Sequence, residues 1–228
     1  QKHLADSFIL YLPKDIVAGD FYFMEDVGDT VILAVADCTG HGVPGAMVSV
    51  VCHNALTRSV KEFGLTEPQK ILDKTRELVL ETFEKSEDQV NDGMDIALCS
   101  INKKTNTLLF SGANNGLFLV RKGELLEFKA DKQPIGKFIH AKPFTARTIT
   151  IEKGDQFYLY SDGYADQFGG EAGKPGGKKF KYSRLKTLIQ EISLKDSEAQ
   201  RTILNETLTN WRGEIEQIDD VCIIGFRF

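Results

Sequence analysis

The sequence lacks several features that would place it in a common class of protein. No run approaches the ~18 apolar residues that a membrane-spanning helix needs, and the N-terminus has no small-residue cleavage site of the kind that ends a signal peptide. The 28 Lys and Arg do not outnumber the 33 Asp and Glu, which argues against nucleic-acid binding through phosphate neutralisation. None of the four cysteines forms a C-x-x-C pair, which argues against a zinc ribbon or a dithiol redox motif.

What is present is the composition of a folded globular chain. The 228 residues are 42% hydrophobic and 27% charged, with a net charge of −5, which suits one large domain or two small ones. The cysteines lie among apolar residues, where a reduced thiol behaves as a small hydrophobe, so we expect a reducing, cytoplasmic location. Because the chain lacks an initiator Met and begins within a pattern, we expect it to be cut from a longer protein.

Hydrophobic periodicity predicts strands at both ends of the chain, two helices early and two helices late. The run TVILAVAD over Thr30–Asp37 is apolar and β-branched, as in a strand buried on both faces. Other strands are expected at Ser7–Leu12, Phe21–Met24, Met94–Ile101, Thr107–Ser111, Leu117–Arg121, Leu125–Lys129, Phe144–Ile151, Gln156–Ser161 and Val221–Phe228. The helical patterns cover Ala46–Phe63, about Thr66–Lys85, Ser183–Ile192 and Asp196–Trp211. The order is not β-α-β alternation, and it favours an α+β fold in which helices cover sheets.

Aspartates recur at the ends of these strands: Asp20, Asp37, Asp162, Asp219 and Asp220. Strand ends at one edge of a sheet can converge, and converging carboxylates repel one another unless they are neutralised. Hard divalent cations with oxygen ligands neutralise them, and two such ions about 3.5–4 Å apart activate water and clamp a phosphoryl group. The alternative for each residue is an ordinary turn Asp, and spacing alone does not decide between the two.

Six segments occur in order along the chain: VAGDFYF (17–23), ADCTGHGVPGAM (36–47), DGMDIAL (92–98), SGANN (111–115), YSDGYADQFGG (160–170) and DDVCIIGFR (219–227). Taken together, they resemble the SpoIIE-like branch of the metal-dependent PPM serine/threonine phosphatases. The resemblance runs from about residue 8 to residue 228, and it implies that residues 1–228 are a single domain, the C-terminal catalytic part of a longer regulatory protein. It implies an α-β-β-α sandwich of two antiparallel sheets flanked by helix pairs, which agrees with the order of elements above.

The resemblance also implies a metal site. It makes Asp20 the first ligand, Asp37 the aspartate that bridges two ions, and Asp162 a third ligand, with Cys38 binding through its backbone carbonyl. Asp219 matches the ligand before the last strand, and Asp220 is the alternative if the register slips by one residue. His41 lies near the position of the general acid proposed for the family, with a structural loop histidine as the alternative. Asp166 matches an aspartate that binds a third ion in other relatives. Some relatives hold that ion through an aspartate at the position of Asn114, so the asparagine here weakens the prediction of a third site.

The implied activity is hydrolysis of phosphoserine or phosphothreonine on a protein with two Mn²⁺ or Mg²⁺ ions, in bacterial signalling. The implied substrate is a phosphorylated STAS-type anti-sigma-factor antagonist. The implied partners are an upstream sensor domain and a second copy of the protein, which would pair through helices upstream of this domain. Because those helices also control activity in the family, we expect low activity from this domain alone. The alternatives are a non-catalytic phosphoprotein-binding or signal-transducing module, and a two-metal hydrolase of nucleotides or diesters, which the acidic charge and the missing P-loop disfavour.

Three further features allow two readings each. Lys14 is either a contact to the substrate phosphate or a solvated surface lysine. The glycine-rich segment Gly169–Gly177 is expected to be an exposed loop. Together with its neighbouring lysines, it is either a flap that steers an anionic phosphoprotein or a solvated insertion. These lysines are Lys174, Lys178, Lys179 and Lys181. Cys38 is a rival nucleophile, but no cation in the sequence pattern would lower the pKa of its thiol.

Overall fold

A computed structural model describes residues 4, 6–83, 92–170 and 177–228 and contains two five-stranded antiparallel sheets. The first sheet has the order β1 (Ser7–Leu12), β12 (Val221–Arg227), β9 (Gln156–Tyr160), β6 (Leu117–Arg121) and β7 (Glu124–Phe128). The second has the order β2 (Phe21–Val27), β3 (Thr30–Cys38), β4 (Met94–Asn102), β5 (Thr107–Ala113) and β8 (Arg147–Thr150). The helices and the small hairpin are α1 (Gly42–Lys61), α2 (Pro68–Phe83), α3 (Gly163–Asp166), α4 (Tyr182–Ile192), α5 (Ser197–Arg212), β10 (Phe168–Gly169) and β11 (Lys178–Lys179).

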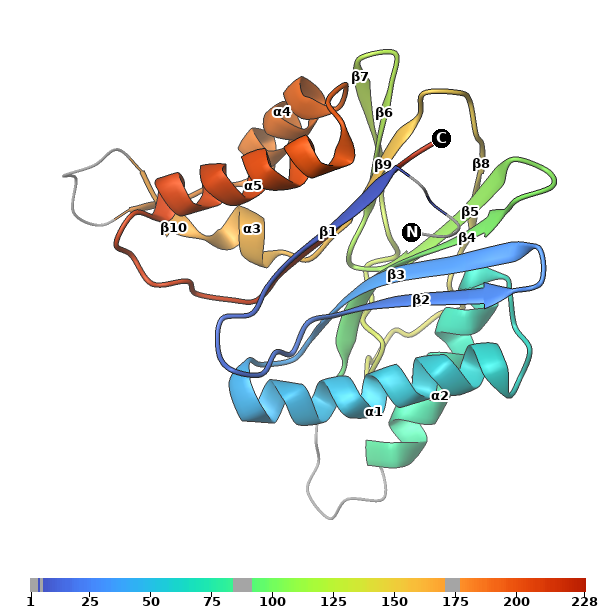
Figure 1. Ribbon diagram of the computed structural model, residues 1–228. Coiled ribbons are helices and arrows are strands. Elements are labelled where there is room, and N and C mark those ends of the chain that lie inside the picture. Colours follow the sequence, from blue (N-terminus) through green and yellow to red (C-terminus); the bar gives the residue numbers. More distant parts are fainter. Residues whose placement is uncertain (1–3, 5, 84–91, 171–176) are drawn as a thin grey trace.

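The two sheets pack face to face, with α1 and α2 outside the second sheet and α4 and α5 outside the first (Figure 1). Strand β3 shows why the layers stack in this way. Val31, Leu33 and Val35 face the core between the sheets. The intervening residues Ile32 and Ala34 face the core under α1 and α2. Because side chains alternate across a strand, a continuous apolar run requires cover on both faces, and the predicted α-β-β-α sandwich is confirmed.

The structure corrects several predicted element boundaries. Helix α1 begins at Gly42, four residues before the expected start, because Pro44 in the first turn needs no intrahelical N–H partner. Helix α2 ends at Phe83, and its predicted end at Lys85 lies outside the described residues. The prediction that Gly169–Gly177 is an exposed loop is wrong at its start, because Gly169 is buried in β10 against the Trp211 backbone. Residues 171–176 of that segment lie outside the described residues.

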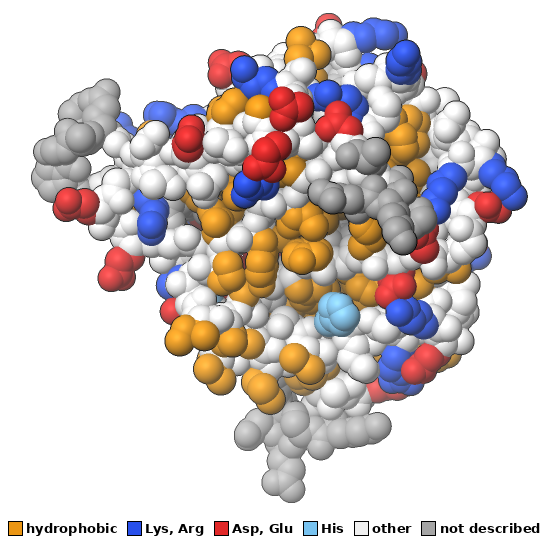
Figure 2. Space-filling model, in the orientation of Figure 1, with side chains coloured by type: hydrophobic (Ala, Val, Ile, Leu, Met, Phe, Trp, Pro, Cys, Tyr) orange, Lys and Arg blue, Asp and Glu red, His pale blue; other side chains and the backbone are white. Residues whose placement is uncertain are grey.

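The exposed side of α1 carries an apolar stripe. Val43, Met47 and Val50 are each at least 66% exposed, and their spacing places them on one face of the helix. Figure 2 shows hydrophobic side chains gathered over this half of the molecule, where α1 and β2 lie. None of the helices in the described part of the chain combines the length and the hydropathy of a membrane span.

Candidate functional site

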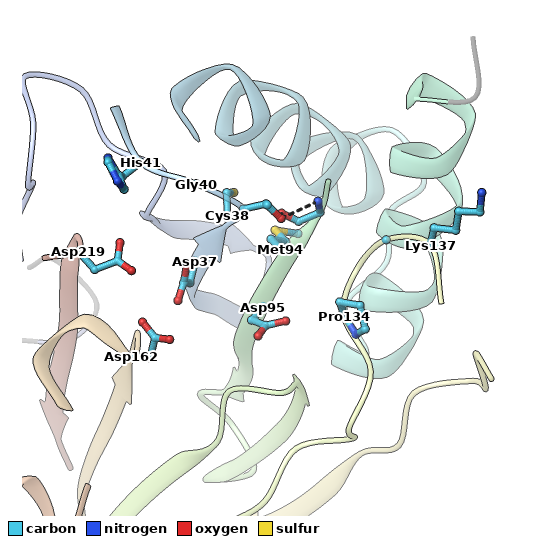
Figure 3. A pocket seen from close by; sticks show the side chains of 13 residues that line it. Asp37, Cys38, Gly40, His41, Met94, Asp95, Pro134, Lys137, Asp162 and Asp219 are labelled. Carbon is cyan, nitrogen blue, oxygen red and sulfur yellow. Dashed lines mark hydrogen bonds between the residues drawn. The ribbon is translucent and has the colours of Figure 1, made fainter. Parts of the chain in front are cut away.

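A polar pocket of about 240 Å³ opens where the two sheets meet at one end. Its acidic residues are Asp37 near the end of β3, Asp95 in β4, Asp162 after β9 and Asp219 before β12. Figure 3 shows Asp37, Asp162 and Asp219 facing a shared space, with Asp95 to one side and His41 near the rim. The structure therefore brings together three of the aspartates singled out in the sequence, from strand ends that lie far apart along the chain.

Asp20 lies beside this pocket and is buried. Its side chain is 3% exposed, and its Oδ2 atom has no hydrogen-bond partner. Burial raises the pKa of Asp20 to about 7; a hydrogen bond with Ser161 opposes the shift, and the charges of Asp220 and Asp219 increase it. A buried carboxylate oxygen without a donor is costly, so this atom is suited to a cationic partner.

The pocket carboxylates raise one another's pKa. Burial, followed by the charges of Asp20 and Asp162, raises the pKa of Asp37 to about 10. Burial and the charge of Asp219 raise the pKa of Asp162, although a hydrogen bond with Asp37 acts in the opposite direction. Such mutual perturbation is the electrostatic signature of like charges forced into one site. Proton sharing or a bound cation relieves it.

The donor set fits a hard divalent cation in kind and in charge. In position it does not yet form a coordination shell. Among the residues that the structure describes, no three His, Cys, Asp or Glu side chains lie close enough together to hold an ion as they stand. The carboxylates surround the pocket, and ion binding would require them to converge further.

Asp220 has a different environment from its neighbour Asp219. One Asp220 oxygen accepts the backbone N–H of Lys14 at 2.7 Å, and the other accepts that of Gly19, also at 2.7 Å. Its carboxylate thus holds the segment that leads into Asp20. Asp219 lines the pocket and Asp220 does not line it, so the geometry favours the first of the two registers considered in the sequence.

Close backbone packing joins that segment to α1. A Cβ atom added to Gly19 would lie 2.3 Å from the Gly40 carbonyl oxygen, and one added to Gly45 would lie 2.2 Å from the same atom. No side chain larger than hydrogen fits at either position without moving the backbone. The loop that carries His41 is therefore fixed against both the Asp20 segment and the first turn of α1.

His41 is held between two charged side chains. Its Nδ1 lies 3.0 Å from Oδ2 of Asp15, and its Nε2 lies 2.9 Å from Nζ of Lys14. An ammonium group only donates, so Nε2 accepts from Lys14 while Nδ1–H donates to Asp15. While Lys14 donates to it, Nε2 carries no proton to give to a leaving group.

Cys38 is poorly suited to act as a nucleophile. Its side chain is buried, and a hydrogen bond with Cys52 together with burial raises the pKa of its thiol far above the ordinary value. A thiol kept protonated is inert. The Cys38 carbonyl oxygen, in contrast, lies where a Cβ on Gly19 would be 3.2 Å from it, at the seam beside Asp20.

The two residues considered for a third ion have protein partners. Oδ2 of Asp166 lies 2.7 Å from Nζ of Lys179, a residue of β11. Asn114 has a left-handed backbone with φ of 57° and donates from Nδ2 to Oδ1 of Asp95 at 2.8 Å. Each side chain is already engaged with the protein, and a third ion would have to compete with these contacts.

Sequence reasoning did not single out Asp95, nor Lys137, although both line the pocket. Asp95 pairs directly with Asp37 in the β3–β4 register, so it belongs to the same strand edge. A signal was present in the segment DGMDIAL, whose apolar run begins at the aspartate. The pairing of two strands separated by 55 residues could not be read from local pattern.

Comparisons with known proteins agree with this geometry. A family model described as Stage II sporulation protein E (SpoIIE) matches residues 27–228. The chain belongs to the SpoIIE family. A search of curated protein sequences found no match.

Solved structures place this SpoIIE-family chain among PP2C-type phosphatase domains. The SiaA-PP2C domain of Pseudomonas aeruginosa is 30% identical, with a TM-score of 0.87 over 98% of this chain and 86% of that one. A structure of the PP2C phosphatase domain and a fragment of the regulatory domain of SpoIIE from Bacillus subtilis is 18% identical, with a TM-score of 0.77 over 97% of this chain and 61% of that one. RsbX in complex with magnesium is 17% identical, with a TM-score of 0.65 over 97% of this chain and 94% of that one.

Proposed function

We propose that this SpoIIE-family domain hydrolyses phosphoserine or phosphothreonine on a protein, with two Mn²⁺ or Mg²⁺ ions as cofactors. The observation that carries the proposal is the gathering of Asp37, Asp162 and Asp219 in one pocket beside the buried, unpartnered oxygen of Asp20. Membership of a phosphatase family and the magnesium complex of RsbX, a relative in fold, support it.

The proposed ligands are the carboxylates of Asp20, Asp37, Asp162 and Asp219 and the backbone carbonyl of Cys38. When bound, the two ions would lower the pKa of a water molecule and neutralise charge on the phosphoryl oxygens. The surrounding residues orient the substrate: Lys14 and Lys137 provide positive charge next to the carboxylates. A substrate phosphate that draws Lys14 away would free Nε2 of His41 to take up a proton and then deliver it to the leaving serine oxygen.

The test is phosphate release from a phosphoserine peptide with and without Mn²⁺. We expect turnover that requires Mn²⁺ and is lost in Asp37→Asn. The matched control is Asp29→Asn, because Asp29 is an exposed turn residue paired with Lys104; this variant should retain the wild-type rate. Failure at millimolar Mn²⁺, with the peptide still bound, would favour the non-catalytic phosphoprotein-binding alternative. Turnover of a nucleotide or a diester in preference to the peptide would favour the other hydrolase class.

Partners and regulation are part of the same proposal. The exposed stripe of Val43, Met47 and Val50 lies on α1, whose first turn packs against the loop that carries His41. We propose that upstream helices, in one or two copies of the longer protein, press on this stripe and so move the ligands together. Low turnover of residues 1–228 alone, raised by the upstream segment, is the expected result. The proposed substrate is a STAS-type phosphoprotein, and the proposed location is cytoplasmic.

A further inference from the structure

A second pocket, of about 540 Å³, lies next to the acidic pocket and has the opposite character. Its lining includes Asn114, Asn115, Lys129, Lys132, Tyr160 and Tyr182. These residues come from the loop after β5, the segment after β7, the end of β9 and the start of α4. The volume is within the range of pockets that bind a side chain or a small ligand.

The two pockets share a wall. Asn114 lines the second pocket, while its amide donates to Asp95 in the acidic pocket at 2.8 Å. Tyr182 lines the second pocket and lies within the electrostatic range of the aspartates at the first. Burial raises the pKa of its hydroxyl, and the charges of Asp162 and Asp166 raise it further. A peptide with one residue in the acidic pocket can therefore place a neighbouring residue in the second pocket.

The second pocket has unused hydrogen-bond donors. The side chain of Asn115 is 7% exposed, and its Nδ2 has no hydrogen-bond partner within the described residues. Lys129 and Lys132 are exposed, and within the same ranges neither forms an ion pair. A buried amide donor without an acceptor is rare, and here it lies in a pocket together with two unpaired ammonium groups.

The carboxylates near this pocket are already paired. Glu127 lines it, but its Oε2 lies 2.8 Å from Nζ of Lys186. Asp131, between the two lysines in the sequence, accepts from the backbone N–H of Thr145 at 2.7 Å and from its hydroxyl at 3.0 Å. The pocket thus offers free donors from Asn115, Lys129 and Lys132, which suit an anionic group.

We propose that the pocket formed by Asn115, Lys129, Lys132 and Tyr182 binds an acidic side chain that flanks the phosphoserine of the protein substrate. This inference rests on the proposed phosphatase function. Because its free donors lie on one side of the acidic pocket, next to Asp95, the second pocket would set both the direction of the peptide and the preference for its sequence. Tyr182, whose ring lies 5.7 Å from that of Tyr160, would form the apolar side of this subsite.

The test compares three substrates in the presence of Mn²⁺: a phosphoserine peptide with Glu on both sides, the same peptide with Gln in those positions, and p-nitrophenyl phosphate. We expect wild type to prefer the Glu peptide by about five- to tenfold in kcat/KM, mostly through KM, since partly exposed ion pairs are individually weak. In Lys129→Gln/Lys132→Gln the preference should disappear, while turnover of p-nitrophenyl phosphate stays unchanged. Lys129→Glu/Lys132→Glu should instead prefer a peptide with Lys flanks.

The matched control is Lys122→Gln/Lys153→Gln, which removes the same charge from turns outside both pockets. This control separates a local subsite from the long-range field of the protein, and it should keep the preference. Loss of the preference in the control, or its survival in Lys129→Gln/Lys132→Gln, would overturn the subsite while the phosphatase function stands. No turnover of any of the three substrates by wild type would contradict the proposed function itself, and the subsite would fall with it.

Discussion

Nζ of Lys14 lies 2.9 Å from Nε2 of His41, on the side of the imidazole opposite its contact with Asp15. The contact with Lys14 therefore decides whether Nε2 of His41 can carry a proton. While Lys14 donates to Nε2, the histidine cannot act as a proton donor there. If a substrate phosphate drew Lys14 away, as proposed above, Nε2 of His41 would be free to carry a proton.

The first prediction separates these roles by leaving group. His41→Ala is expected to lower kcat on a phosphoserine peptide by about 10²-fold or more, because a serine alkoxide needs a proton to leave. On p-nitrophenyl phosphate, whose leaving group is a much weaker base, the same variant should lose little. Lys14→Met should raise KM on both substrates. Equal loss on both substrates in His41→Ala would show that the histidine is structural.

The second prediction distinguishes Asp219 from Asp220. Asp220→Asn should lower the free energy of unfolding by about 1–3 kcal/mol, because charged acceptors of the Lys14 and Gly19 backbone N–H groups are lost. Asp219→Asn should leave stability unchanged or raise it, yet abolish Mn²⁺-dependent turnover. Urea unfolding together with phosphate release measures both. A stable Asp220→Asn protein with no turnover would reverse the assignment.

The third prediction concerns the packing around the Gly40 carbonyl. Gly45→Ala should destabilise the protein by about 1–3 kcal/mol, because its methyl group would be 2.2 Å from that oxygen and must displace α1 or the loop. Met47→Ala, on the exposed face of the same helix, should change stability by less than about 0.5 kcal/mol. Thermal unfolding compares them, and equal melting temperatures would show that the loop yields freely.

The fourth prediction follows from the raised pKa values and concerns the protein in the presence of a chelator. A carboxyl whose pKa is higher in the folded than in the unfolded chain disfavours the folded state as pH rises. Its stabilising effect is complete below the pKa of the unfolded chain, about 4. The effect is lost as the pH rises from there to the pKa of the folded chain, which is about 7 for Asp20 and about 10 for Asp37. Asp37→Asn should therefore melt higher than wild type at pH 8, by at least ~3 °C, and no higher at pH 4.

Mn²⁺ should reverse this order at pH 8, because an ion that binds only the folded wild type stabilises it by mass action. Asp29→Asn should follow wild type under every condition. An Asp37→Asn protein that melts below wild type at pH 8 with the chelator present would contradict the proposed charge repulsion.

The layered fold could be predicted because its signals are local and agree with one another. The run Thr30–Asp37 predicts a strand buried on both faces, and β3 is such a strand. The helical pattern over Asp196–Trp211 predicts a helix, and α5 covers Ser197–Arg212, with Asp196 as its N-cap accepting from the backbone N–H of Ala199. The short elements α3, β10 and β11 were missed, because two to four residues carry little periodicity and tertiary contacts fix them.

The acidic residues could be singled out, but their arrangement could not. Motif resemblance pointed to Asp37 and Asp162, whereas Asp95 entered the pocket through strand register alone. The partners of His41 could not be read from the sequence either. Lys14 and Asp15 reach His41 because the Asp220 carboxylate, just before β12, accepts the backbone N–H of Lys14. The close contacts of Gly19 and Gly45 with the Gly40 carbonyl hold the His41 loop beside that segment.

The central claim, that the pocket carboxylates form a site for divalent cations, is tested most directly by titrating the protein with Mn²⁺ and recording free Mn²⁺ by electron paramagnetic resonance. The account predicts two bound ions per chain in wild type and the loss of both in Asp37→Asn, the predicted bridging ligand, with Asp29→Asn binding as wild type does. Equal Mn²⁺ binding by wild type and Asp37→Asn would contradict it.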